Sequence, residues 1–277
     1  MRERDDVTDF EWAQLEPDLP KSTGRGGRWK EHRKIINGIL FRIRTGIPWR
    51  DLPRRFGSWQ TCYDRHWRWS ADGTWERIVR AGQAGADADG RIDWSGECTP
   101  TVCRAHQHAA GARKQAPRKT GKRTRPAQHR PDEALGRSRG GPTTKIPLAG
   151  EGGLRPLAML VRLRVPRLDG GRPRTRPDHL SGDKAYSSRR NRRYLRRRQI
   201  KHTIPERRDQ RAHRLRHGSS GGRPTGFDAA RYGRRNEVER LINRLKANRA
   251  VATRFDKRAY VSYGTLTVAA LHLWLCA

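Results

Sequence analysis

Acidic residues are scarce in this sequence: 28 Asp and Glu stand against 62 Lys and Arg in 277 residues, which gives a formal net charge of +34. A chain with this excess repels itself at low salt and is attracted to polyanions. Nucleic acid is therefore the expected partner. Most of the basic residues are Arg, which makes bidentate contacts with phosphate; the Arg-rich usage of a GC-rich genome explains the same observation.

Long apolar runs are also missing. A membrane-spanning helix needs about 20 apolar residues, and the run from Leu266 to Leu275 is too short, so it predicts a buried final helix and no membrane partner. The charged segment Met1 to Asp6 has no apolar core after it, so no signal peptide is expected. The four cysteines are scattered, and without an export signal they predict no disulfide framework.

The first part of the chain, residues 6–81, is predicted to be a small helical domain. Thr8 and Glu11 have the spacing of a capping box, which predicts a helix from Asp9. A second helix is expected over 30–45, because apolar residues recur there at helical spacing. Shorter helices are expected over 51–56, 59–69 and 75–79, the middle one capped by Ser58.

The helix expected over 59–69 carries aromatic residues on one face, at Trp59, Tyr63 and Trp67. Arg65 and Arg68 lie off that face, so one side can pack on the second helix while the other meets a DNA groove. This arrangement predicts a helix-turn-helix-like DNA-binding domain in which Arg65 and Arg68 contact DNA. The alternative is an ordinary helical bundle with a basic surface.

The remainder, residues 91–277, divides into a basic segment and an α/β domain. Residues 112–140 are rich in Arg, Lys, Gly and Pro and cannot form a core alone, so they are expected to be flexible and either to order on DNA or to serve as a linker. Strand and helix patterns then alternate, which predicts an α/β fold. Strands are expected over 143–148, 154–161, 180–184 and 201–204, helices over 187–198 and 227–248, and a basic loop over 207–225.

Four chemically active residues share one face of the helix expected over 227–248. Tyr232, Arg235, Glu239 and Lys246 are spaced by 3, 4 and 7 residues, which are helical offsets. The set suits a phosphodiester substrate, because Arg235 and Lys246 can hold phosphates while Glu239 holds a metal ion. A solvated face with ordinary ion pairs explains the spacing equally well.

Several motifs in order along the chain resemble one family. The spacing Tyr-x2-Arg-x3-Glu-x6-Lys and the stretch 235–246 resemble the signature around the third catalytic acid of DDE transposases in the insertion sequence 4 and 5 groups. Gly182 to Ser188 resembles the family's second-Asp motif, and Arg104 to Ala112 resembles the segment after its first Asp. Stretches 47–53 and 57–61 resemble its small DNA-binding domain. The resemblance covers almost the whole chain.

That resemblance implies a ribonuclease H-like catalytic domain, in which three carboxylates bind two Mg²⁺ ions roughly 4 Å apart. Asp183 and Glu239 would be catalytic metal ligands, and Tyr232, Arg235 and Lys246 would position DNA. The implied activity is cleavage and strand transfer of double-stranded DNA, at inverted repeats and at a target, in the bacterial cytoplasm. Because transposition joins paired ends, a homodimer is expected by analogy.

The sequence departs from this family at the first catalytic Asp, where it has Thr99. A neutral hydroxyl cannot replace a bridging carboxylate. Glu97 lies two residues earlier and points to the same face of a strand, but about 6 to 7 Å along it, which makes it a weak substitute. The main alternative to an active transposase is therefore a catalytically inactive remnant that acts only as a DNA-binding protein.

Two further departures favour a decayed copy. The resemblance implies that a segment which relatives have after Val161 is deleted here, and Pro147 stands inside an expected strand, where it removes a ladder donor. Two other interpretations remain. A zinc site would use Cys98, Cys103, His106 and His108, but their spacing lacks the usual loop between ligand pairs. An RNA-binding protein fits the charge but does not explain Asp183 or the Glu239 helix.

Overall fold

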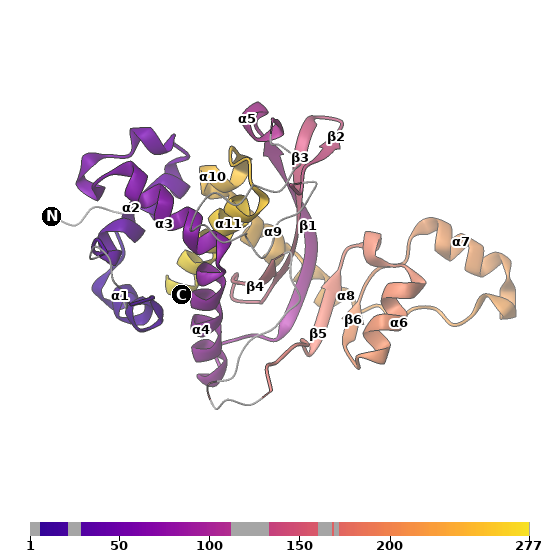
Figure 1. The fold of residues 1–277 in the computed structure, drawn as a ribbon. Coiled ribbons are helices and arrows are strands. Elements are labelled where there is room, and N and C mark those ends of the chain that lie inside the picture. Colours follow the sequence, from indigo (N-terminus) through magenta and orange to yellow (C-terminus); the bar gives the residue numbers. More distant parts are fainter. Residues whose placement is uncertain (1–5, 22–28, 112–132, 160–167, 169–171, 277) are drawn as a thin grey trace. The chain divides into compact units, whose positions relative to one another are not determined.

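The computed structural model describes residues 6–21, 29–111, 133–159, 168 and 172–276. Within these ranges the chain is a mixed α/β protein that begins with helices and continues into a mixed sheet (Figure 1). It divides into two compact units, and each unit combines segments that are distant in the sequence. The first contains residues 1–85, 102–146 and 243–277, and the second contains 86–101 and 147–242.

The helices of the first unit begin as the sequence predicts. The capping box of Thr8 and Glu11 is complete, and both of its reciprocal hydrogen bonds are present at the start of α1 (Asp9–Leu15). The apolar stripe on α2 (His32–Thr45) is buried. Gly46 ends α2 in the left-handed conformation, with φ of 71°, where glycine has no steric penalty.

The segments after α2 depart in detail from the expected helices. The turn region expected as a helix over 51–56 consists of two 3₁₀ turns, Trp49–Asp51 and Arg54–Phe56. Ser58 precedes α3 (Trp59–Ala71), but its side chain makes no capping bond to the backbone; it donates to Gln60 instead. The last helix of this region, α4 (Thr74–Ala88), is much longer than the predicted 75–79.

The final apolar segment is a buried helix, as expected. In α11 (Ala259–Leu275) most residues are buried, and the helix packs on α3 and α2 within the first unit. Gly264 allows the close approach to α3, because a Cβ atom there would lie 2.6 Å from Cβ of Ser70. The helical core is therefore completed by the C-terminal part of the chain. Within the described ranges, no helix combines the length and apolar character that a membrane crossing requires.

The strands form one sheet in the order β2-β3-β1-β5-β6, with β4 on β3 and β7 on β1. β1 runs parallel to β5, and β5 runs parallel to β6, whereas β3 is antiparallel to β2 and to β4. The strand bounds are β1 (Ser95–Ala105), β2 (Gly136–Ser138), β3 (Gly141–Gly150), β4 (Pro156–Met159), β5 (His179–Gly182), β6 (Lys201–Thr203) and β7 (Thr253–Arg254).

The strand predictions for the α/β part are confirmed in position, with shifted ends. Pro147 lies in β3 and is exposed. The deletion expected after Val161 falls on residues outside the described ones, as does most of the basic segment 112–140, of which 133–140 are described. Short helices complete the first unit: α5 (Gln107–Ala110) and α10 (Arg249–Ala252).

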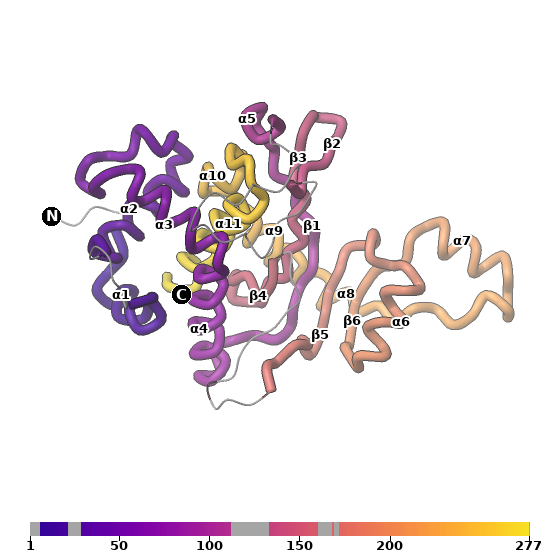
Figure 2. The backbone as a smooth tube through the Cα atoms, in the orientation of Figure 1, coloured from indigo at the N-terminus to yellow at the C-terminus, as the bar shows by residue number. Residues whose placement is uncertain are grey.

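Two of the helices in this part of the chain differ from the sequence prediction. The predicted helix over 187–198 is present as α6 (Arg189–Arg197), which follows β5 and precedes β6 along the chain (Figure 2). The predicted loop over 207–225 is wrong, because α7 (Arg208–Arg216) is helical. The single helix predicted over 227–248 is interrupted after α8 (Ala229–Gly233), and α9 (Asn236–Ala247) starts anew.

Candidate active site

The two strands that carry the first two acid positions of the family motif are hydrogen-bonded neighbours. β1 and β5 pair in parallel, with Glu97 opposite Ser181 and Cys98 opposite Gly182. The paired register ends at Cys98 and Gly182, and Thr99 and Asp183 are the residues that directly follow these two positions. Paired strands lie about 4.8 Å apart, so a carboxylate at position 99 would stand next to that of Asp183. The predicted first and second acid positions thus directly follow a hydrogen-bonded pair of residues on neighbouring strands.

Asp183 directly follows β5 and is partly exposed. It caps the 3₁₀ turn Lys184–Tyr186, and its Oδ1 accepts a hydrogen bond of 3.3 Å from the amide of Ala185. One carboxylate oxygen is thereby oriented by the backbone, since short capping side chains hold the first turn of a helix. Thr99, its neighbour, is only 5% exposed.

Glu97 is also 5% exposed, and its carboxylate is already engaged. Its Oε2 accepts a hydrogen bond of 3.3 Å from the amide of Val238, in the first turn of α9. Free amides and the positive end of the helix dipole attract a carboxylate at this position. Burial nevertheless raises the pKa of Glu97 to about 7, opposed by that hydrogen bond and assisted by nearby Glu237. Glu97 therefore caps α9 in this structure.

Glu239, the third acid position, lies on α9 with 54% of its side chain exposed. Its Oε1 lies 3.2 Å from Nη2 of Arg235, an ion pair with i,i+4 spacing. The Arg235 guanidinium lies 6.0 Å from the centre of the Tyr232 ring. Three members of the predicted helical face therefore remain in one contact chain.

The physical form of that face differs from the prediction. Tyr232 belongs to α8 and Arg235 immediately precedes α9, so the four residues do not share one continuous helix. Lys246 lies in the last turn of α9 and is partly buried. The end of α8 at Gly233 explains the difference, because glycine is a weak helix former.

The expectation that Arg65 faces away from the core is wrong. Arg65 is 7% exposed, its Nη1 lies 2.6 Å from Nδ1 of His32, and its guanidinium lies over the rings of Trp29 and Trp69. Cation–π contacts with these rings fix it inside the helical unit. Arg68, one turn along, is exposed. Contact of either residue with DNA stays a prediction.

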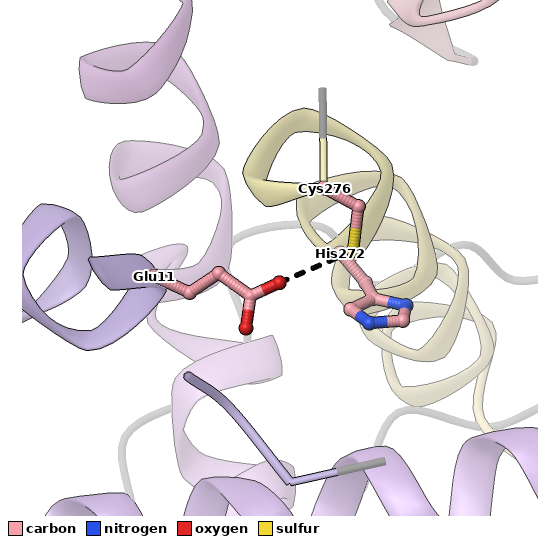
Figure 3. A group of neighbouring side chains, drawn as sticks. All are labelled: Glu11, His272 and Cys276. Carbon is pink, nitrogen blue, oxygen red and sulfur yellow. Dashed lines mark hydrogen bonds between the residues drawn. The ribbon is translucent and has the colours of Figure 1, made fainter. Parts of the chain in front are cut away.

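Among the described residues, one group of potential metal ligands lies close together, in the first unit. Glu11, His272 and Cys276 bring a carboxylate oxygen, an imidazole nitrogen and a thiol within 4.8 Å of one another (Figure 3). The Cys276 thiol donates to Glu11 at 3.3 Å, and the other Glu11 oxygen completes the capping box of α1. These hydrogen bonds account for the cluster by tying α1 to the end of α11.

The residues of the zinc interpretation form no such group among the described residues. The His106 ring stacks on Phe255, and its Nδ1 accepts a hydrogen bond from the amide of His108. Burial raises the pKa of the Cys98 and Cys103 thiols, which disfavours the thiolate form that binds zinc.

The described residues also do not fit the two-ion magnesium site that the resemblance implies. Mg²⁺ binds through carboxylate oxygens, but position 99 offers a hydroxyl and Glu97 is bound to the start of α9. Asp183 and Glu239 alone remain, and Glu239 is paired with Arg235. A bridging carboxylate, which two ions require, is therefore missing from this set.

Comparison with known proteins agrees with the motifs. Residues 7–79 match a family model described as "Putative transposase of IS4/5 family". The chain is 32% identical over 111 residues to the uncharacterized protein y4sN of Sinorhizobium fredii, across 40% of this chain and 85% of that protein. The chain belongs to the IS4/5 transposase family.

A second relative of this transposase family is the insertion element IS402 uncharacterized 16.2 kDa protein of Burkholderia cepacia. It is 36% identical over 96 residues, which cover 32% of this chain and 65% of the relative. The family model itself covers α1, α2, α3 and the start of α4. No solved structure matches the chain.

One contact beside the candidate site has no counterpart in the sequence motifs. Asp93, at the start of the segment leading into β1, forms an ion pair of 3.0 Å with Arg234. Arg234 also pairs with Glu237 at 3.2 Å. These contacts hold the α8–α9 junction beside β1, and no spacing rule connects two residues so distant in sequence.

Proposed function

We propose that this chain binds DNA as a transposase-family protein of a bacterial insertion sequence. We further propose that it no longer cleaves DNA strands, because residue 99 is not a carboxylate. The observation that carries this proposal is the parallel register of β1 and β5, which pairs Cys98 with Gly182, the residues directly before Thr99 and Asp183. The ribonuclease H-like site that the motifs imply would combine acids from neighbouring strands and a helix, and the parallel pairing of β1 with β5 supports the strand part of that arrangement.

In this proposal, residues around the missing carboxylate still have groups that can contact DNA. Asp183 is held by the Ala185 amide at the end of β5. Arg235 neutralises Glu239 and can exchange that contact for a phosphate, since guanidinium binds both anions in the same bidentate manner. The carboxylate of the first acid position is lost, because Thr99 stands there, so DNA would bind while the phosphodiester stays intact.

DNA binding is supported by the formal net charge of +34 and by family membership. The DNA would be the inverted repeats of the element and a target duplex, and two copies of the chain would hold paired ends. Each Lys or Arg that neutralises a phosphate releases counterions, so this binding should weaken steeply as salt rises.

An active enzyme that uses Glu97 in place of the missing Asp is the second candidate. Its support is that Glu97 and Thr99 are both buried at alternate positions of β1, on one side of the strand. Against it, Glu97 accepts the Val238 amide proton, and its raised pKa favours the neutral form, which is a poor ligand for Mg²⁺.

The test compares the natural chain with Glu97→Gln on a duplex that carries the terminal inverted repeats flanking the gene, with Mg²⁺ present. The proposal expects both proteins to shift the duplex at a stated salt concentration and neither to nick it. Cleavage by the natural chain that disappears in Glu97→Gln would instead establish Glu97 as the substitute acid. Binding no tighter than to structured RNA would contradict the DNA-binding part.

A further inference from the structure

The helix that follows Asp183 presents a one-sided basic surface. α6 begins six residues after Asp183 and contains no acidic residue. Its exposed side chains include Arg190, Arg193, Tyr194 and Arg197, which are spaced by 3, 1 and 3 residues and so share one helical face. We call these four residues the α6 arginine face.

The opposite side of α6 is fixed by packing and hydrogen bonds. Leu195 packs with Ile200 and Ile204 in a small buried cluster. Arg192 is 8% exposed, and its Nη2 donates to the carbonyl oxygen of Ile204 at 2.8 Å. Because this inner side is held by β6 and the segment after it, the orientation of the outer face is determined.

The guanidinium groups of the α6 arginine face have no protein partner among the residues that the structure describes. Neither Arg190, Arg193 nor Arg197 makes a hydrogen bond or ion pair with a described side chain. By contrast, Arg214 and Arg231 elsewhere in this unit pair with carboxylates. Three unpaired like charges on one helix face repel each other, and an arriving anion relieves this repulsion.

Tyr194 gives the face a second chemical property. Its ring is 49% exposed, with the Arg198 guanidinium 5.9 Å from its centre. An exposed aromatic ring among arginines is the combination that binds nucleic-acid strands, through stacking together with phosphate contacts. A purely anionic protein or lipid surface would use the arginines but would leave this ring without a partner.

A hollow of about 690 Å³ continues the basic surface beyond Arg197. It is lined by five arginines and a single acid, Asp178, which is already paired with Arg174 at 2.7 Å. Arg176 donates to the carbonyl oxygen of Arg198, and Arg198 donates to that of Thr175. These reciprocal bonds hold two guanidiniums in place, so part of the surface is organised before any ligand arrives.

We propose that the α6 arginine face, with the arginine-lined hollow beside it, binds the phosphates of the DNA strand that passes Asp183, while Tyr194 stacks on that strand. This inference rests on the proposed function, because it takes DNA as the partner. It adds a location to that function, namely a surface in the second unit that is separate from the helical N-terminal segment matched by the family model.

The test measures binding of the full chain to a fluorescent inverted-repeat duplex and to a random duplex of equal length, over a range of salt. The triple variant Arg190→Gln, Arg193→Gln, Arg197→Gln should lower the slope of log affinity against log salt by roughly 3, because each lost phosphate contact removes about 0.9. The loss should be equal on both duplexes, since phosphate contacts carry no sequence information.

The matched control removes the same number of charges from exposed positions of α7, as Arg208→Gln, Arg211→Gln, Arg216→Gln. It should lower the slope by less than 1. Equal losses in both triple variants would overturn the proposal, because net charge alone would then explain binding. Circular dichroism verifies that each variant folds.

Tyr194 is tested separately on a single-stranded oligonucleotide. Tyr194→Ala should weaken binding at least about fivefold, whereas Tyr194→Phe, which keeps the ring, should not. Equal affinity of the Ala variant and the natural chain would refute the stacking role. If the natural chain binds no DNA at all, the proposed function itself fails, which is a result distinct from failure of this surface.

Discussion

Glu97 offers a quantitative test of the site geometry through pH. The folded chain buries this carboxyl against α9 and raises its pKa from the ordinary 4.5 to about 7. Between these values the folded state binds more protons than the unfolded state. The stabilising contribution is therefore complete below about pH 4.5 and is lost as pH rises through about 7. The shift corresponds to roughly 3 kcal/mol of unfolding free energy.

The assay is urea unfolding of the natural chain and of Glu97→Gln, followed by tryptophan fluorescence at several pH values between about 4 and 8 and fixed salt. Gln keeps an acceptor for the Val238 amide but cannot titrate. The stability of the Gln variant relative to the natural chain should therefore improve by roughly 3 kcal/mol across this range.

Glu239→Gln serves as the control, since it removes an exposed carboxylate from α9, the helix that Glu97 caps. It shows how much pH dependence an exposed Glu contributes. If the Glu97→Gln and natural curves stay parallel from about pH 4 to 8, Glu97 does not change its protonation state on folding, and the buried cap described above is refuted. Each transition must be cooperative for the comparison to be valid.

Further predictions concern packing in the first unit. Gly264→Ala should destabilise the chain by about 1–3 kcal/mol, because its Cβ would lie 2.6 Å from Cβ of Ser70. Gly82→Ala on α4, where nothing lies within 4 Å of the added Cβ, should instead stabilise the chain by up to about 1 kcal/mol. Equal urea midpoints of the two variants would contradict the close packing at Gly264. Arg254→Met should lower the unfolding free energy by about 3–5 kcal/mol in urea unfolding, because Arg254 is 2% exposed and donates to Thr144 and to the carbonyl oxygen of Glu133. A loss of unfolding free energy below about 1 kcal/mol would show that these buried hydrogen bonds contribute little.

Local signals predicted part of this fold correctly. The capping box at Thr8 and Glu11 fixed the start of α1 because all of its atoms lie within one helical turn. The apolar run at the C-terminus identified α11 because few other environments accept it. The break between α8 and α9 was missed, since the helical spacing around Glu239 continues through Gly233 although the backbone does not.

Features that depend on distant segments could not be predicted from the pattern. Arg65 is buried because Trp29 and Trp69 supply ring faces for its guanidinium, which spacing within one helix does not reveal. The Glu97 cap of α9 joins residues from separate parts of the chain. The site positions themselves came from motif resemblance, and the strand pairing involves the residues directly before Thr99 and Asp183.

The central claim, that position 99 separates this chain from a cleaving transposase, is tested most directly by restoring the carboxylate. Thr99→Asp and its neutral isostere Thr99→Asn are compared with the natural chain for Mg²⁺-dependent nicking of the inverted-repeat duplex, at protein concentrations that give equal DNA occupancy. Nicks are expected with Thr99→Asp only. Cleavage by the natural chain, or equal inactivity of folded, DNA-bound Thr99→Asp and Thr99→Asn, would contradict it.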